Sequence, residues 1–144
     1  MSIVSNVSPL APKNFPTMHS ISGVRFATAN AGIKSGDSED VTLILLEPGT
    51  VIAGLFTSST TRSAPVIDCQ NKIGINLANT GAAIIINSGN ANAFTGRHGE
   101  LAVRAIIAEL STRVQIPVER IFSCLLYTSP SPRDLSTSRM PSSA

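Results

Sequence analysis

The sequence predicts a mixed α/β fold. Short apolar runs joined by polar turns fill most of the chain, and one long amphipathic segment follows them. Apolar runs of four to eight residues are typical of strands, whereas apolar residues at three- and four-residue steps are typical of a helix. With 144 residues, of which 42% are hydrophobic, the chain is long and apolar enough to bury a core. We therefore expect one domain with a mainly β first half and a later helix.

Each element can be justified in order along the chain. Residues 1–22 are rich in Pro, Ser and Asn and form an entry arm, because a residue before proline avoids the helical region. Strands are then expected over 23–28, 41–46, 51–57 and 82–87, separated by turn residues. The last of these runs is apolar almost throughout, which is typical of a strand buried on both faces.

A helix is expected to begin after Gly99. Its apolar residues recur at helical steps and are Leu101, Val103, Ala105, Ile107, Ala108, Leu110 and Val114. Pro117 ends this pattern, because proline cannot continue a helix. Residues 121–123 read as the start of a further strand.

The end of the chain differs in composition from the rest. Residues 124–144 are dominated by Ser, Pro and Thr, which predicts a disordered tail. One set of codons for residues 124–134 spells the transposon-end adapter of short-read sequencing libraries, and residues 138–144 match the continuation of that adapter. We therefore interpret 124–144 as translated adapter and 1–123 as the N-terminal part of a longer domain. A genuine Ser/Pro-rich tail is the alternative.

Composition excludes several classes of function. The net charge is only +2, no Lys/Arg cluster is present, and the chain has one Tyr and no Trp, which argues against a nucleic-acid partner. No apolar segment approaches the roughly 18 residues of a membrane span. Two cysteines without metal-ligand spacing, and no secretory signal, favour a cytoplasmic protein with no metal site.

The segment 87–96, Asn-Ser-Gly-Asn-Ala-Asn-Ala-Phe-Thr-Gly, is the most promising functional candidate. It connects a buried strand to a helix N-terminus, where free N–H groups and the helix dipole can stabilise an anion or an oxyanion. Gly89 and Gly96 permit close approach and positive φ. A purely structural interpretation stands beside this one, in which Thr95 caps the helix and the asparagines satisfy a sharp turn.

Other candidate residues have weaker signals. Asp37, Glu39 and Asp40 are expected to form a solvated acidic loop rather than an acid/base pair. Cys69 is expected to be a packed thiol, and His98 an exposed side chain. The hydroxyl-rich stretch before Pro65 has no base beside it and is expected to form a turn.

These residues also resemble a known family. The stretch 87–96, together with Pro-Lys-Asn-Phe at 12–15, Ala-Gly-Ile-Lys at 31–34, Asp-Val-Thr-Leu at 40–43 and Ala-Pro-Val at 64–66, is similar to the N-terminal part of ornithine acetyltransferases. These enzymes are also called glutamate N-acetyltransferases. The likeness covers about residues 9–123.

The resemblance implies an acyltransferase of arginine biosynthesis that moves an acetyl group from N-acetylornithine to glutamate, with acetyl-CoA as a further donor in some members. It implies a layered helix–sheet–sheet–helix sandwich, incomplete in this chain, and no metal or prosthetic group. The family's oxyanion hole matches Thr95 and Gly96.

In the family, self-cleavage frees a threonine that acts as the nucleophile, and two pairs of cleaved chains form a heterotetramer. That threonine has no counterpart here, so we expect this chain to be inactive by itself. An autocleaving β-aminopeptidase-like hydrolase and a non-catalytic module are the alternatives.

Overall fold

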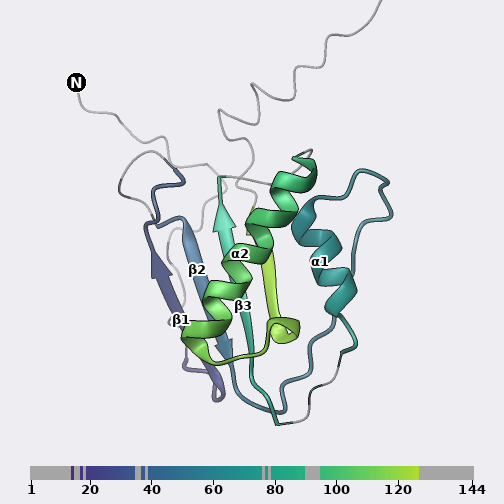
Figure 1. Cartoon of the computed structure of the whole chain (residues 1–144). Helices are drawn as coiled ribbons and strands as arrows, with labels where there is room; N and C mark the ends of the chain where they lie inside the picture. Colours follow the sequence, from purple (N-terminus) through teal and green to yellow (C-terminus); the bar gives the residue numbers. More distant parts are fainter. Residues whose placement is uncertain are drawn as a thin grey trace, which may run out of the picture.

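The computed structural model describes residues 14, 17, 19–34, 37, 39–75, 77, 79–89 and 95–126. Within them, a four-stranded sheet carries two helices on one face (Figure 1). The elements are β1 (Val24–Ala29), β2 (Val41–Leu46), α1 (Ala64–Lys72), β3 (Ala82–Ser88), α2 (Gly96–Val114), the 3₁₀ turn η1 (Val118–Arg120) and β4 (Ile121–Leu126). This is the mixed α/β class that the sequence predicts.

The strand order β1-β2-β3-β4 places the parallel pair at one end of the sheet. β1, β2 and β3 pair antiparallel, whereas β3 and β4 run parallel and are connected through α2. Ser88 pairs with Leu126, so both parallel strands end at the same edge. The first turns of α1 and α2 lie toward that edge (Figure 1). This geometry gathers the ends of two strands and the beginnings of two helices in one region, where ligands commonly bind in α/β folds.

The core lies between the sheet and α2. Val103 and Ile107, four residues apart on one face of α2, are each 3% exposed. They form a cluster with Ala83 of β3 and Ile121 of β4, both fully buried. The predicted apolar stripe is confirmed for Val103, Ile107, Leu110 and Val114, whereas Leu101, Ala105 and Ala108 of the same pattern are exposed.

Most of the predicted elements are confirmed, and one strand is wrong. Strands over 23–28, 41–46 and 82–87 are present within about one residue, and the predicted helix begins earlier, at Gly96. The stretch 51–57 forms no strand, and the side chains of Val51 and Leu55 are 90% and 101% exposed. Alternating apolar residues form a strand only when they lie beside a neighbouring strand, and no strand of the described sheet pairs with this stretch.

Helix α1 is the element that sequence patterning missed. Its nine residues are nearly neutral in hydrophobicity and bury only Pro65. The available signal was local: Ser63 stands at the N-cap and a proline follows in the first turn, an order that favours helix initiation. Contacts with β4 and α2 complete its stabilisation.

The predicted disorder after Ser123 is wrong for three residues, and the boundary itself stays a prediction. β4 continues through Cys124 to Leu126, which pair with Ile86 to Ser88. These three residues are therefore ordered, because β3 offers free main-chain groups to any chain extending alongside it. The rest of the predicted tail, 127–144, lies outside the described residues. No helix in the described ranges is long and apolar enough to cross a membrane.

Candidate functional site

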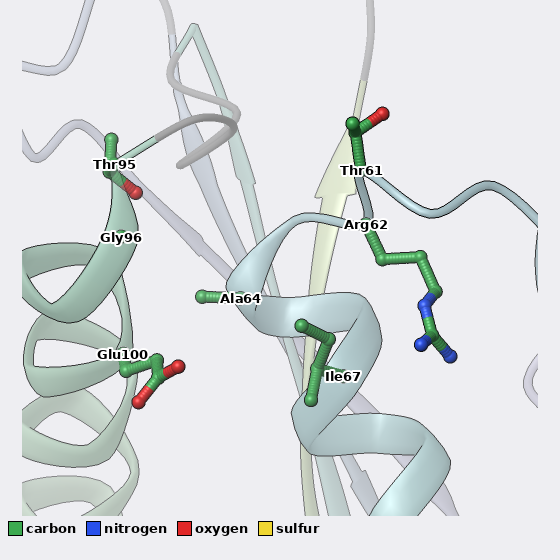
Figure 2. A pocket seen from close by; sticks show the side chains of 7 residues that line it. All are labelled: Thr61, Arg62, Ala64, Ile67, Thr95, Gly96 and Glu100. Atoms are coloured by element: carbon green, nitrogen blue, oxygen red, sulfur yellow. The ribbon is translucent and has the colours of Figure 1, made fainter.

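An open hollow of about 160 Å³ lies between the first turns of α1 and α2 (Figure 2). Its lining residues are Thr61, Arg62, Ala64, Ile67, Thr95, Gly96 and Glu100. Both residues singled out as an oxyanion hole, Thr95 and Gly96, are among them. Two segments far apart in the sequence thus meet at the candidate site.

Thr95 occupies the N-cap position of α2, with helical backbone angles, but its side chain makes no capping hydrogen bond. The interpretation of Thr95 as a side-chain cap is therefore wrong. In Figure 2 its side chain extends into the space between the two helices. The hydroxyl of Thr95 thus lies at the hollow rather than on the helix end.

Gly96 begins α2 with φ of +52°, a conformation that side chains rarely adopt. A Cβ built there would meet no atom within 4 Å. The glycine is therefore required by its backbone conformation and not by crowding. Because it begins the helix, its N–H group has no partner within α2.

The charges around the hollow oppose one another. Neither α1 nor α2 has an acidic residue in its first turn, so the positive ends of both helix dipoles act there. Glu100, one turn into α2, opposes this potential from below, and its carboxylate points toward α1 (Figure 2). The guanidinium of Arg62 points away from the hollow, and its Nη1 donates a hydrogen bond to Oε1 of Gln70 at 2.6 Å.

The predicted functional stretch 87–96 is described only at its two ends. Ser88 is 5% exposed and Gly89 has φ of +93°, so the positive φ predicted for glycine in this loop is confirmed at both ends. Residues 90–94, including Asn90 and Asn92, lie outside the described residues.

The prediction of a solvated acidic loop before β2 is wrong for Asp40. Asp40 is only 3% exposed, and its carboxylate accepts hydrogen bonds from the N–H groups of Ala31, Ile33 and Lys34. These bonds hold the pKa of Asp40 below its usual value of 3.8, and the bond from Ala31 has the largest effect. Burial acts in the opposite direction. Asp37 and Glu39 are exposed, as predicted.

Two further predictions for single residues are confirmed. Cys69 is a packed thiol whose Sγ donates to the main-chain oxygen of Ser123 at 3.1 Å. Burial, followed by the negative charge of Asp68, raises its pKa to about 11. His98 is exposed on α2. In the described part of the chain, no three His, Cys, Asp or Glu side chains converge to hold a metal ion.

The α1 side of the hollow was missed from sequence. Thr61 and Arg62 belong to the hydroxyl-rich stretch that was expected to be a turn only, and Ala64 and Ile67 belong to the helix that patterning missed. The Ser-x-Pro start of α1 was the one signal that could have indicated a second helix N-terminus at the site.

Comparison with known proteins gives the same family from sequence and from structure. The sequence profile of the ArgJ family matches residues 25–125. The chain is 48% identical over 123 residues to the arginine biosynthesis bifunctional protein ArgJ of Ruegeria pomeroyi, and 47% identical over 109 residues to that of Bradyrhizobium diazoefficiens. These matches cover 85% and 76% of this chain.

The chain spans only 30% and 25% of the length of those two relatives. Two crystal structures are similar to it, each with a TM-score of 0.63. One is the arginine biosynthesis bifunctional protein of Bacillus halodurans, 25% identical, and the alignment covers 81% of this chain and 60% of that one. The other is the ornithine acetyltransferase of Mycobacterium tuberculosis in complex with ornithine, 29% identical, with 78% and 61% covered. The profile match spans more than half of the chain, and the chain therefore belongs to the ArgJ family.

Proposed function

We propose that this chain forms part of a glutamate N-acetyltransferase that transfers acetyl from N-acetylornithine to glutamate, with Thr95 and Gly96 as its oxyanion hole. The observation that carries the proposal is the position of these two residues in one hollow beside two helix N-termini. The relatives support the reaction class, since one is described as an ornithine acetyltransferase complexed with ornithine.

The chemistry requires donors aimed at a developing negative charge. A threonine nucleophile, freed by self-cleavage elsewhere in the complete protein, attacks the acetyl carbonyl carbon and passes its hydroxyl proton to its own amine. The carbonyl oxygen becomes an oxyanion, to which the Thr95 hydroxyl and the Gly96 N–H donate hydrogen bonds. Collapse breaks the C–N bond, and the proton leaves with the amine of ornithine. The amine of glutamate then attacks the acetyl-threonine ester by the reverse sequence.

Several features of the complete enzyme belong to the same proposal. The reaction needs no metal or prosthetic group, because threonine, its amine and the oxyanion hole supply all of its steps. The cleaved chains assemble as a heterotetramer. The 144-residue chain alone neither cleaves itself nor transfers acetyl groups, since it lacks that threonine.

A chimera tests this function. Residues 1–123 of this chain replace the corresponding segment of the Ruegeria pomeroyi protein, to which the chain is 48% identical. We expect self-cleavage on a denaturing gel and acetyl exchange between N-acetylornithine and glutamate. A cleaved, folded chimera that shows no exchange would contradict the proposal. Hydrolysis of β-aminoacyl peptides by that chimera would favour the aminopeptidase instead.

Variants at Thr95 test the oxyanion hole itself. Thr95→Ala removes the hydroxyl, and removing one such donor typically lowers kcat by about 10²- to 10³-fold. Thr95→Ser keeps the hydroxyl and should retain kcat within a few-fold. Thr112→Ala, on the exposed side of the same helix, is the control, because its Oγ1 bonds the carbonyl of Ala108 within the helix. Equal activity of Thr95→Ala and the unmodified chimera would remove Thr95 from the site.

A further inference from the structure

A buried carboxylate lies at the sheet edge from which the chain departs for Thr95. Asp40 immediately precedes β2, and both of its carboxylate oxygens accept main-chain hydrogen bonds. Oδ1 accepts from Ala31 at 2.7 Å, and Oδ2 accepts from Ile33 at 2.6 Å and Lys34 at 3.0 Å. A single side chain therefore holds the backbone of the 31–34 segment.

The main chain of Asp40 also holds the end of β3. Its carbonyl oxygen accepts a hydrogen bond from the N–H of Ser88 at 2.9 Å and from the Ser88 hydroxyl at 3.4 Å. Its own N–H donates to the carbonyl of Ala29 at 3.1 Å. Asp40 thus connects the end of β1, the 31–34 segment and the last residue of β3.

The segment held by Asp40 packs directly against the chain as it leaves β3. A Cβ on Gly89 would lie 2.9 Å from Cγ of Lys34 and 3.4 Å from Cγ2 of Ile33. The first distance is too short for any larger residue unless the Lys34 side chain moves, whereas the second is an ordinary contact. Since φ of Gly89 is +93°, only glycine fits there without strain.

The other end of the same connection is held by packing. Gly99, in the first turn of α2, is buried, and Val103 and Ile107 anchor that helix in the core. Among the described residues, the connection from β3 to α2 is therefore held at both of its ends, at Ser88 and Gly89 and at the core beneath α2. Misplacing a catalytic group by about 1 Å can lower the rate about 10²-fold.

We propose that Asp40 is a positioning residue for acetyl transfer: by holding 31–34 against Gly89, it fixes the point at which the chain leaves β3 for the oxyanion hole. Asp40 touches no substrate in this proposal and acts only through the backbone that it holds. The proposal rests on the function proposed above.

The test uses the chimera and the isosteric variant Asp40→Asn. The asparagine oxygen is a weaker acceptor than a carboxylate oxygen. The asparagine NH₂ group only donates, so it cannot accept the main-chain hydrogen bonds that it would face. We expect kcat to fall by about 10- to 100-fold while KM for N-acetylornithine stays within about 3-fold, because only the transition state needs the aligned donors. Glu39→Gln, at the exposed neighbouring position, should leave both values unchanged.

A second readout separates this role from a general loss of stability. Hydrogen exchange should become faster at the amides of Ala31, Ile33 and Lys34 in folded Asp40→Asn, and the amide resonance of Gly89 should shift. Faster exchange with unchanged kcat would overturn the proposal. If the chimera with Asp40 intact is inactive, the proposed function fails, whereas the exchange and the Gly89 resonance still report whether Asp40 supports the 31–34 segment.

Gly89→Ala provides an independent variant should Asp40→Asn not fold. It introduces the crowding with Lys34, and we expect kcat to fall by about 10-fold or more. Lys34→Ala removes the Cγ atom that the new methyl meets, so the loss caused by Gly89→Ala should be smaller in that background. An equal loss in both backgrounds would show that the 31–34 segment does not position Gly89.

Discussion

The thiol of Cys69 in α1 donates a hydrogen bond to the main-chain oxygen of Ser123 in β4 across a distance of 3.1 Å. The two residues are 54 positions apart in the sequence. This contact, with the neighbouring bond from Lys72 Nζ to the carbonyl of Ile121 at 3.0 Å, attaches α1 to the parallel end of the sheet. It therefore supports the α1 side of the hollow that contains Thr95.

The two cysteines should differ strongly in reactivity. Burial raises the pKa of Cys69 from 9.0 to about 11, which lowers its thiolate fraction near pH 8 by about 100-fold, whereas Cys124 is exposed. Titration of the folded chain with a disulfide reagent should therefore show one fast and one slow thiol. Cys124→Ser should remove the fast phase. A fast phase that survives this substitution would contradict the burial of Cys69.

Asp40 should make stability depend on pH in the acid range. Its pKa is lowered in the folded state, so its contribution is fully present above about 3.8 and is lost as pH falls through the folded-state pKa. The difference in unfolding free energy between the unmodified chain and Asp40→Asn should therefore shrink below that pH. Urea unfolding across pH 2–7 measures it, with Glu39→Gln as control. A difference independent of pH would show that the carboxylate charge plays no part.

Lys72 should contribute more to stability than a similar ion pair at the surface. Its side chain is 12% exposed and lies 2.7 Å from Asp68, and it also bonds the Ile121 carbonyl. Lys72→Met keeps the aliphatic stem and should lower the unfolding free energy by about 1–3 kcal/mol. Arg113→Met breaks an ion pair with Glu109 that is 75% and 64% exposed, and should cost less than about 1 kcal/mol. Equal losses in thermal or urea unfolding would refute the distinction.

Two neighbouring isoleucines on α2 test the placement of the core. Ile107 is 3% exposed and belongs to the core cluster, whereas Ile106 is 46% exposed. Ile107→Ala should lower the unfolding free energy by about 2–5 kcal/mol, because it leaves a cavity. Ile106→Ala should lower it by less than about 1 kcal/mol. The opposite order would mean that α2 presents a different face to the sheet.

Sequence patterning correctly predicted the elements whose own residues form a clear apolar pattern. The apolar runs at β2 and β3 and the helical repeat of α2 each carry enough apolar surface to specify their type, and all three are present. The same patterning failed for residues 51–57 and for α1. A strand requires a neighbour that the local sequence cannot name, and α1 depends on contacts with β4 and α2 rather than on a stripe of its own.

For the candidate site, the sequence by itself determined that Thr95 and Gly96 stand where a strand gives way to a helix, and that glycine is needed there for backbone freedom. Only the tertiary structure decided what surrounds them. The parallel pairing of β3 with β4 places the first turn of α2 at one sheet edge, and α1, packed against β4 and α2, brings Thr61 and Ala64 to the same hollow as Thr95. Burial of Asp40 likewise depends on N–H groups of a separate loop, because hydrogen bonding and packing between distant segments are properties of the folded chain.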